Sequence, residues 1–216
     1  MKNIRAVRQS CAREQKEVSS MNEKKVLILT LIWMLLPVAG MAQPEGTGEA
    51  IRPALVVVDV QNAYLPLMSE QEQKIALRVI NGAIWFFRQH KLPVVRVHHS
   101  DLRWGPAEGT KEFAFVDTIL PPGEDVRVVK RFPSAFVQTD LDRILKEKGC
   151  NTVFLCGLSA TGCVLPTYFG GVERGYKVFM IREGIMSHNP DYTNAVKDIC
   201  DSLSFESMMF FLQLRQ

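Results

Sequence analysis

The sequence predicts an α/β fold of three layers, in which a six-stranded parallel sheet carries helices on both faces. Two observations predict it. Short apolar runs rich in β-branched residues lack polar alternation, which is typical of strands buried on both faces of a parallel sheet. Between these runs lie segments whose apolar residues recur every three or four positions, as in amphipathic helices. Strands and helices that alternate in this way form a sheet covered on both sides.

The composition is that of one globular domain. The chain has 216 residues, of which 47% are hydrophobic and 23% charged, so it is neither disordered nor a multi-span membrane protein. The net charge of +3 is unevenly placed: residues 1–42 hold 7 Lys and Arg against 3 Asp and Glu, and the remainder holds 19 against 20. Because the body of the chain has no excess of basic residues, we expect no nucleic-acid partner.

The first 42 residues predict an upstream extension followed by a signal peptide. After Met21 come two lysines, an apolar run, and small residues at Gly40 and Ala42, the layout of a secretory signal. We expect translation to start at Met21 and cleavage to follow Ala42, so that the protein is exported to the periplasm or medium and keeps no membrane contact. An uncleaved membrane anchor is the alternative, although the run contains Pro37 and is short for a bilayer span.

The domain boundaries follow from this reading. Residues 43–52 form a polar lead-in, and residues 53–216 form the domain. The first strand is expected at 54–60, and the first helix at 69–90, where Ser69 and Glu72 have the spacing of a capping box. The Gly- and Pro-containing interval 100–125 predicts a loop that partly covers the pocket. Further strands are expected at 93–98, 126–130, 152–156, 177–181 and 207–212, and helices near 139–148, 161–174 and 191–203.

Reactive side chains stand where the predicted strands end, which is where parallel sheets bind ligands. Asp59 ends the first strand, Lys130 the third, and the loop GLSATGC with Cys163 follows the fourth. A buried carboxylate is costly unless it is paired, and the start of a helix offers N–H groups that stabilise a thiolate. A thiol beside a carboxylate base and an ammonium meets the needs of covalent catalysis. Structural roles remain open for each: a capping aspartate, an exposed lysine and a buried thiol.

Three motifs in this order resemble a known family. They are VVVDVQNAY at 56–64, VVKRFPSAF at 128–136, and GLSATGCVLPT at 157–167 followed by RGYKV. Together they resemble the isochorismatase-like cysteine hydrolases, which include nicotinamidases and N-carbamoyl amidohydrolases. The resemblance spans about residues 53–212 and implies that family's hydrolase fold.

The resemblance implies a catalytic triad of Asp59, Lys130 and Cys163. Asp59 would take the thiol proton, Lys130 would balance the charge and orient the carboxylate, and Cys163 would attack a carbonyl carbon to form a thioester. The backbone N–H groups of Ser159 and Cys163 would form the oxyanion hole. The family's cis peptide bond would fall between Leu158 and Ser159.

Aromatic residues near these motifs are candidates for the substrate pocket. Tyr64 resembles an aromatic residue that lines the pocket in relatives, and Trp104, Phe136 and His99 also stand close to the predicted site. A role in the core is the alternative for the aromatic residues. We expect a small planar or apolar substrate.

No metal and no cofactor are expected. Nicotinamidases bind a metal through an aspartate and several histidines that follow the second strand, where this chain reads HHSDLRWGPAEG. The adjacent His98 and His99 point to opposite faces of a strand, so they cannot easily share one ion. The next histidine is His188, which we expect at the surface. The expected partner is a small-molecule substrate, and the resemblance implies a homo-oligomer.

The expected function is an exported cysteine hydrolase that cleaves a small amide or carbamoyl C–N bond. One alternative keeps the fold and changes the bond to the vinyl ether of an isochorismate-type substrate, for which relatives do not use the cysteine as nucleophile. Another is a catalytically silent small-molecule-binding member of the fold. That reading predicts the loss of a triad residue, whereas Asp59, Lys130 and Cys163 are all present.

Overall fold

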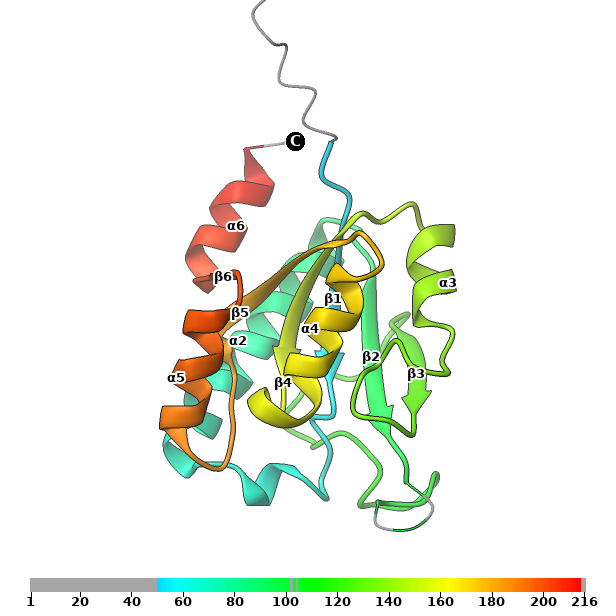
Figure 1. Cartoon of the computed structure of the whole chain (residues 1–216), viewed down its shortest axis with the longest axis vertical. Coiled ribbons are helices and arrows are strands. Elements are labelled where there is room, and N and C mark those ends of the chain that lie inside the picture. The colour runs from blue at the N-terminus through cyan, green and yellow to red at the C-terminus, as the bar shows by residue number, and fades with distance from the viewer. Residues whose placement is uncertain (1–49, 102, 104, 215–216) are drawn as a thin grey trace, which may run out of the picture. The chain divides into compact units, whose positions relative to one another are not determined.

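The computed structural model describes residues 50–101, 103 and 105–214, and it confirms the predicted α/β architecture (Figure 1). One six-stranded sheet has the order β3-β2-β1-β4-β5-β6, and all five pairs of neighbouring strands are parallel. The strands are β1 (Pro53–Val58), β2 (Val94–His99), β3 (Val126–Lys130), β4 (Thr152–Gly157), β5 (Lys177–Ile185) and β6 (Ser202–Leu203). The predicted extension and signal peptide lie outside the described residues.

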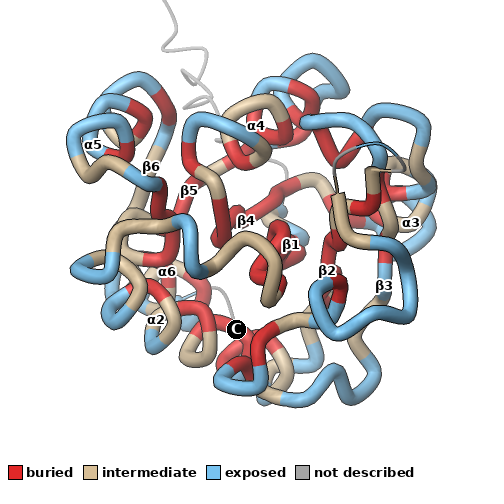
Figure 2. The backbone as a smooth tube through the Cα atoms, turned by 90° about the horizontal axis from the view of Figure 1, so that it is seen from below, coloured by how far each residue is buried: buried red, intermediate tan, exposed pale blue. Residues whose placement is uncertain are grey.

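Helices cover both faces of this sheet, and each face has its own hydrophobic core. One face packs against α2 (Glu70–Gln89) and α6 (Phe205–Gln213). The other packs against α3 (Leu141–Glu147), α4 (Leu165–Val172) and α5 (Pro190–Ile199). Figure 2 shows the buried strands in the middle and exposed residues on the outer sides of the surrounding helices. Within the part of the chain that the structure describes, no helix is long and apolar enough to cross a bilayer.

The strand β1 shows why its sequence is apolar throughout. All six residues are buried, and successive side chains point to opposite faces. Val56 and Val58 belong to the core under α3, α4 and α5, whereas Leu55 and Val57 belong to the core under α2 and α6. A strand buried on both sides therefore cannot alternate polar and apolar residues.

The prediction of a strand at 207–212 is wrong, because these residues lie in the helix α6. Met208 and Leu212 are four positions apart and fill the core together, and the Ser204 hydroxyl caps the helix by accepting from the Ser207 N–H at 3.1 Å. The sixth strand is Ser202–Leu203, inside the segment predicted as the end of the preceding helix. A short apolar run has the same composition in a buried strand and a buried helix.

The predicted capping box at the start of α2 is also absent. Ser69 makes no side-chain cap, and the Glu72 carboxylate instead accepts from the Ser187 N–H at 3.1 Å and the Thr193 hydroxyl at 3.0 Å. Glu72 therefore ties α2 to the loop that follows β5 and to α5.

The interval 100–125 connects β2 to β3 and is anchored to the sheet by charge. The Asp125 carboxylate, which is 3% exposed, lies 2.7 Å from Arg96 of β2 and 2.6 Å from Arg88 of α2. Arg88 and Arg96 also donate to the carbonyl oxygens of Leu120, Pro121 and Pro122. The second half of the loop, from 120 to 125, is thereby held against α2 and β2.

Candidate active site

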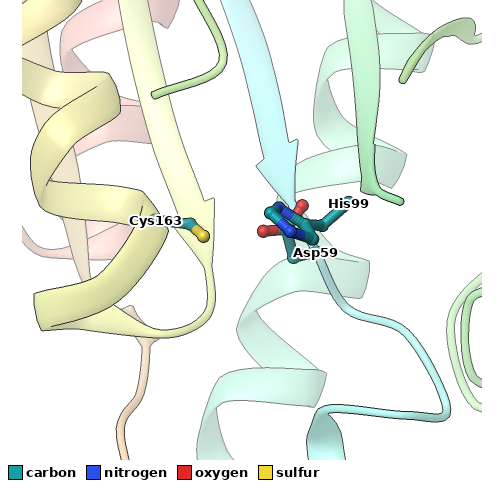
Figure 3. Close-up of side chains that lie close together, drawn as sticks. All are labelled: Asp59, His99 and Cys163. Atoms are coloured by element: carbon teal, nitrogen blue, oxygen red, sulfur yellow. The ribbon is translucent and has the colours of Figure 1, made fainter. Parts of the chain in front are cut away.

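The carboxyl ends of β1, β2, β3 and β4 bring four reactive side chains together. Asp59 follows β1, His99 ends β2, Lys130 ends β3, and Cys163 lies in the turn after β4. Since these strands are adjacent in the sheet, their ends share one edge. Asp59, His99 and Cys163 face one another across it (Figure 3).

The Lys130 ammonium is the centre of this group. Its Nζ lies 2.8 Å from Asp59 Oδ2, 3.0 Å from Cys163 Sγ and 2.8 Å from His99 Nδ1. The side chains of Lys130 and Asp59 are 0% and 2% exposed. Burial of an isolated charge costs several kcal/mol, so the two residues are held as an ion pair, and the ammonium protons also reach the sulfur and the imidazole.

Asp59 is held in an unusual backbone conformation directly after β1. Its φ is 53°, and its N–H donates to the Val97 carbonyl at 2.9 Å. Oδ2 contacts Lys130, whereas the buried Oδ1 accepts no hydrogen bond from the described residues. Burial raises the pKa of Asp59, and the Lys130 charge opposes that rise. Asp59 therefore combines an unused acceptor atom with an increased proton affinity.

Cys163 is a thiol in the resting site. Burial and the nearby charge of Asp59 raise the pKa of Cys163 to about 12, although the charge of Lys130 lowers it. Desolvation is the largest of these effects, and it favours the neutral thiol over the thiolate. The N–H groups of Gly162, Cys163 and Val164 all point at the Ser159 carbonyl oxygen, at 3.0 to 3.1 Å, and this π turn (Ala160–Val164) precedes α4.

The turn after β4 places the predicted oxyanion donors. The peptide bond between Leu158 and Ser159 is cis, as the family resemblance implied. The Cys163 N–H is engaged by the Ser159 carbonyl at 3.0 Å, whereas the described residues offer the Ser159 N–H no hydrogen-bond acceptor. Only one of the two predicted donors is therefore free in the resting structure.

A cavity of about 230 Å³ opens onto the sulfur. It is lined by Asp59, Tyr64, Leu67, Met68, His99, Leu158, Ser159 and Cys163. The Tyr64 ring meets the His99 ring edge to face, with centroids 5.9 Å apart. Burial and the charge of Asp59 raise the pKa of Tyr64 to about 12, so its phenol is neutral. The cavity is small and largely apolar.

The predicted pocket residues have different outcomes. Tyr64 and His99 line the cavity, and Trp104 lies outside the described residues. Phe136 is a correction: it is 4% exposed, stacks on Tyr176 at 5.8 Å and packs under α4. The glycine pair at 170–171 makes room for this ring, since a Cβ at either position would lie 3.3 Å from it.

Sequence reasoning missed the apolar lining formed by Leu67, Met68 and Leu158. Leu67 ends a 3-10 turn (Leu65–Leu67) that closely follows Asp59, and Leu158 directly follows β4. Only their proximity to the strand ends could have indicated them, because an apolar residue in a pocket looks like any core residue in a sequence.

The two adjacent histidines point in opposite directions, as predicted. His99 faces the cavity, whereas His98 lies between Phe113 and Phe115, with ring centroids 5.0 Å and 4.4 Å away. His188 is exposed and contacts Tyr192.

A metal ion does not fit the cluster in this arrangement. Asp59, His99 and Cys163 do offer ligand atoms within 4.8 Å of one another. However, the Lys130 ammonium contacts all three of these groups. A metal cation would have to displace this charge or be repelled by it.

Comparisons with known proteins find similar sequences and similar folds. Residues 53–200 match the family model described as the isochorismatase domain. The secreted isochorismatase effector of Verticillium dahliae is 28% identical over 145 residues, which cover 66% of this chain and 76% of that protein. Ureidoacrylate amidohydrolase of Methylorubrum extorquens is 34% identical over 174 residues, which cover 62% of this chain and 70% of that protein. The crystal structure of N-carbamoylsarcosine amidase from Thermoplasma acidophilum has a TM-score of 0.63 at 27% identity, with 72% of this chain and 97% of that chain covered.

Proposed function

Because this chain belongs to the isochorismatase family of hydrolases, we propose that it cleaves a small amide or carbamoyl C–N bond with Cys163 as nucleophile. The observation that carries the proposal is the position of the Lys130 ammonium, which contacts the sulfur of Cys163 and the carboxylate of Asp59 at once. The names of two similar proteins, an amidohydrolase and an amidase, support the choice of a C–N bond.

The first step follows from the protonation state of the resting site. Cys163 Sγ attacks the carbonyl carbon of the substrate while its proton passes to the unused Oδ1 of Asp59. A C–S bond forms, and the carbonyl π electrons become a lone pair on oxygen. Since the thiol was neutral, the negative charge moves from Asp59 to the substrate oxygen. The raised pKa of Asp59 favours this transfer.

The second step releases the nitrogen. The lone pair on the substrate oxygen re-forms the C=O bond, and the C–N bond breaks with its electron pair on nitrogen. The nitrogen takes the proton held by Asp59, so a thioester and an ionised Asp59 remain. Water then attacks the thioester while Asp59 accepts a proton from it. The C–S bond breaks, the sulfur regains its proton, and the carboxylic acid product leaves.

The substrate oxyanion needs hydrogen-bond donors. The Ser159 N–H has no acceptor among the described residues and is the donor ready in the resting state. The Cys163 N–H becomes the second donor only if it gives up its 3.0 Å contact with the Ser159 carbonyl. Losing one such donor typically costs 10²–10³-fold in kcat, so this rearrangement is part of the proposal.

The experiment combines turnover with site-selective labelling. The purified protein is assayed for ammonia release with a panel of small amides and carbamoyl compounds, beside Cys163→Ala, Asp59→Asn and the control Cys150→Ala. The rate of iodoacetamide labelling is measured from the intact mass of each protein. We expect Cys163→Ala and Asp59→Asn to lose turnover and Cys150→Ala to keep it. Cys163 opens onto the cavity beside Asp59, which can accept its proton, so it should be labelled ahead of the buried Cys150, Cys156 and Cys200. The fast label should be absent from Cys163→Ala.

Two outcomes would contradict the proposal. Hydrolysis of an isochorismate-type vinyl ether that survives Cys163→Ala but not Asp59→Asn would support the alternative reaction, in which sulfur is not the nucleophile. Equal, slow labelling of all thiols without turnover would favour a small-molecule-binding protein.

Export belongs to the same proposal. A similar protein is described as secreted, and the sequence of residues 21–42 predicts a signal peptide. The mass of the protein recovered from its native host tests this directly: a chain that starts near Gln43 is expected, and a chain that retains residues 21–42 would contradict cleavage.

A further inference from the structure

The geometry points to His99 as the residue that selects the substrate: we infer that its Nε2–H donates a hydrogen bond to an acceptor atom of the substrate's acyl group, beside the scissile carbonyl. This inference rests on the proposed function, which places that carbonyl at Cys163 Sγ. It assigns a substrate class, namely small uncharged acyl compounds that carry an ether oxygen, a carbonyl oxygen or a ring nitrogen near the reacting carbon.

The contact with Lys130 determines which nitrogen of His99 carries the proton. Lys130 Nζ lies 2.8 Å from His99 Nδ1, and an ammonium group can only donate. Nδ1 must therefore be the acceptor, so the proton of the neutral ring is on Nε2. Burial and the charge of Lys130 lower the pKa of His99 to about 4, which keeps the ring neutral at physiological pH.

The backbone of His99 is held on both sides by one buried side chain. The His99 N–H donates to Gln61 Oε1 at 2.7 Å, and Gln61 Nε2 donates to the His99 carbonyl at 3.1 Å. Gln61 is 0% exposed and also donates to the Phe113 carbonyl at 2.8 Å. His99 and Lys130 are partners in the register of β2 and β3, which places both side chains on one face of the sheet.

The Nε2–H is the polar feature that this arrangement leaves free. The described residues offer Nε2 no acceptor, and the ring lines the cavity beside the apolar Leu67, Met68 and Leu158. An unpaired donor in an apolar pocket penalises ligands that lack an acceptor. Among the described lining residues there is no Lys or Arg, so a substrate carboxylate would find no lining cation there.

A matched pair of aldehydes tests the inference without requiring turnover. Methoxyacetaldehyde and butyraldehyde have the same length and differ by an ether oxygen in place of a methylene. Either can add to Cys163: a C–S bond forms, and the thiol proton ends on the former aldehyde oxygen. Protection of Cys163 against iodoacetamide, read by intact mass, reports occupancy. We expect methoxyacetaldehyde to protect at roughly tenfold lower concentration, the effect of one hydrogen bond.

Two substitutions distinguish the role of the Nδ1 of His99 from the role of its Nε2. In His99→Asn, the amide oxygen takes the place of Nδ1 and can accept from Lys130, but the Nε2–H is lost. In His99→Gln, the amide nitrogen reaches the place of Nε2 and can donate. The preference for methoxyacetaldehyde should disappear in His99→Asn and persist in His99→Gln. No preference in the unsubstituted protein, or the same preference in His99→Asn, would overturn the inference.

Nitrogen-15 NMR of the imidazoles tests the tautomer of His99 on which the inference depends. His99 should show a protonated Nε2 and an unprotonated Nδ1, with no titration between pH 8 and pH 5, because its pKa is lowered to about 4. A proton on Nδ1 would overturn the inference even if Cys163 is reactive. If Cys163 shows no selective labelling while the predicted tautomer is present, the proposed nucleophile fails instead.

Discussion

At the residue scale, Lys130 connects stability with chemistry. Its ammonium is fully buried and lies within 3.0 Å of a carboxylate, a thiol and an imidazole. A buried pair is weak evidence for stability in itself, but breaking one by removing a partner typically costs about 3–5 kcal/mol. Because the same contacts serve the proposed reaction, loss of activity alone cannot separate the two roles of Lys130.

A double substitution separates them. Lys130→Met should lower the free energy of unfolding by about 3–5 kcal/mol at pH 7, because Asp59 is left charged and buried without its cation. Combining it with Asp59→Asn removes the charge and should recover most of that loss, while activity stays absent. Urea unfolding measures the stability of the single and the double variant, and the turnover assay measures their activity.

The pH dependence has a definite sign. In Lys130→Met, the folded-state pKa of Asp59 lies above the unfolded value, because burial raises it and the opposing cation is gone. The folded state then binds more protons, so the stability lost at pH 7 should return as the pH falls. A Lys130→Met protein as stable as the unsubstituted one at pH 7 would contradict the buried ion pair.

At the element scale, the close approach of β1 and β4 positions the site. Val58 and Gly157 are partners at the carboxyl ends of these strands, one residue before Asp59 and two before Ser159. Gly157 has a φ of 118°, and a Cβ there would lie 2.1 Å from the Val58 carbonyl oxygen. Only glycine fits this position, because both the backbone angle and the space exclude a side chain.

The matched pair Gly157→Ala and Gly175→Ala tests this reading. Both positions have positive φ, but nothing lies within 4 Å of a Cβ at Gly175. Gly175→Ala should therefore cost only about 1–2 kcal/mol, the price of the backbone angle. Gly157→Ala should cost several times more in a thermal unfolding experiment and should abolish Cys163-selective labelling. Equal losses for both variants would show that the close contact with Val58 has no effect.

At the scale of the whole molecule, the loop 100–125 joins the active-site edge to the far end of the sheet. Asp125 anchors its return through Arg88 and Arg96, and Gln61 joins its middle, at Phe113, to the backbone of His99. These contacts join residues that lie 29 to 52 positions apart along the chain.

Asp125→Asn should loosen this loop. Arg96 is only 4% exposed and would lose its charged partner, so we expect a loss of about 3 kcal/mol in unfolding free energy. Hydrogen exchange across 105–124 should become faster, as followed by mass spectrometry. Asp117→Asn, at an exposed position in the same loop, is the control and should change neither. Unchanged exchange in Asp125→Asn would show that the loop is held by its other contacts.

Much of the fold and part of the site were predictable from local patterns. The runs at 54–60, 126–130 and 152–156 correspond to β1, β3 and β4 within two residues. β1 and β4 are buried throughout, and burial on both faces leaves a continuous apolar signature. β3 lies at the edge of the sheet and is only partly buried, with Arg127 exposed. Polar or thiol side chains that interrupt or follow such runs stand out in the sequence. This is why Asp59, Lys130 and Cys163 could be predicted as site residues. The segment 207–212 failed because composition alone does not separate a buried helix from a buried strand.

The sequence by itself therefore determined the parallel α/β architecture, the family, and the three reactive residues at strand ends. Only the tertiary structure decided that burial raises the pKa of Cys163, that Phe136 packs under α4, and that His99 accepts from Lys130. The physical reason is the range of the interactions. Periodicity records how each segment is buried, whereas a pKa or a side-chain contact depends on which distant strands become neighbours and in what register.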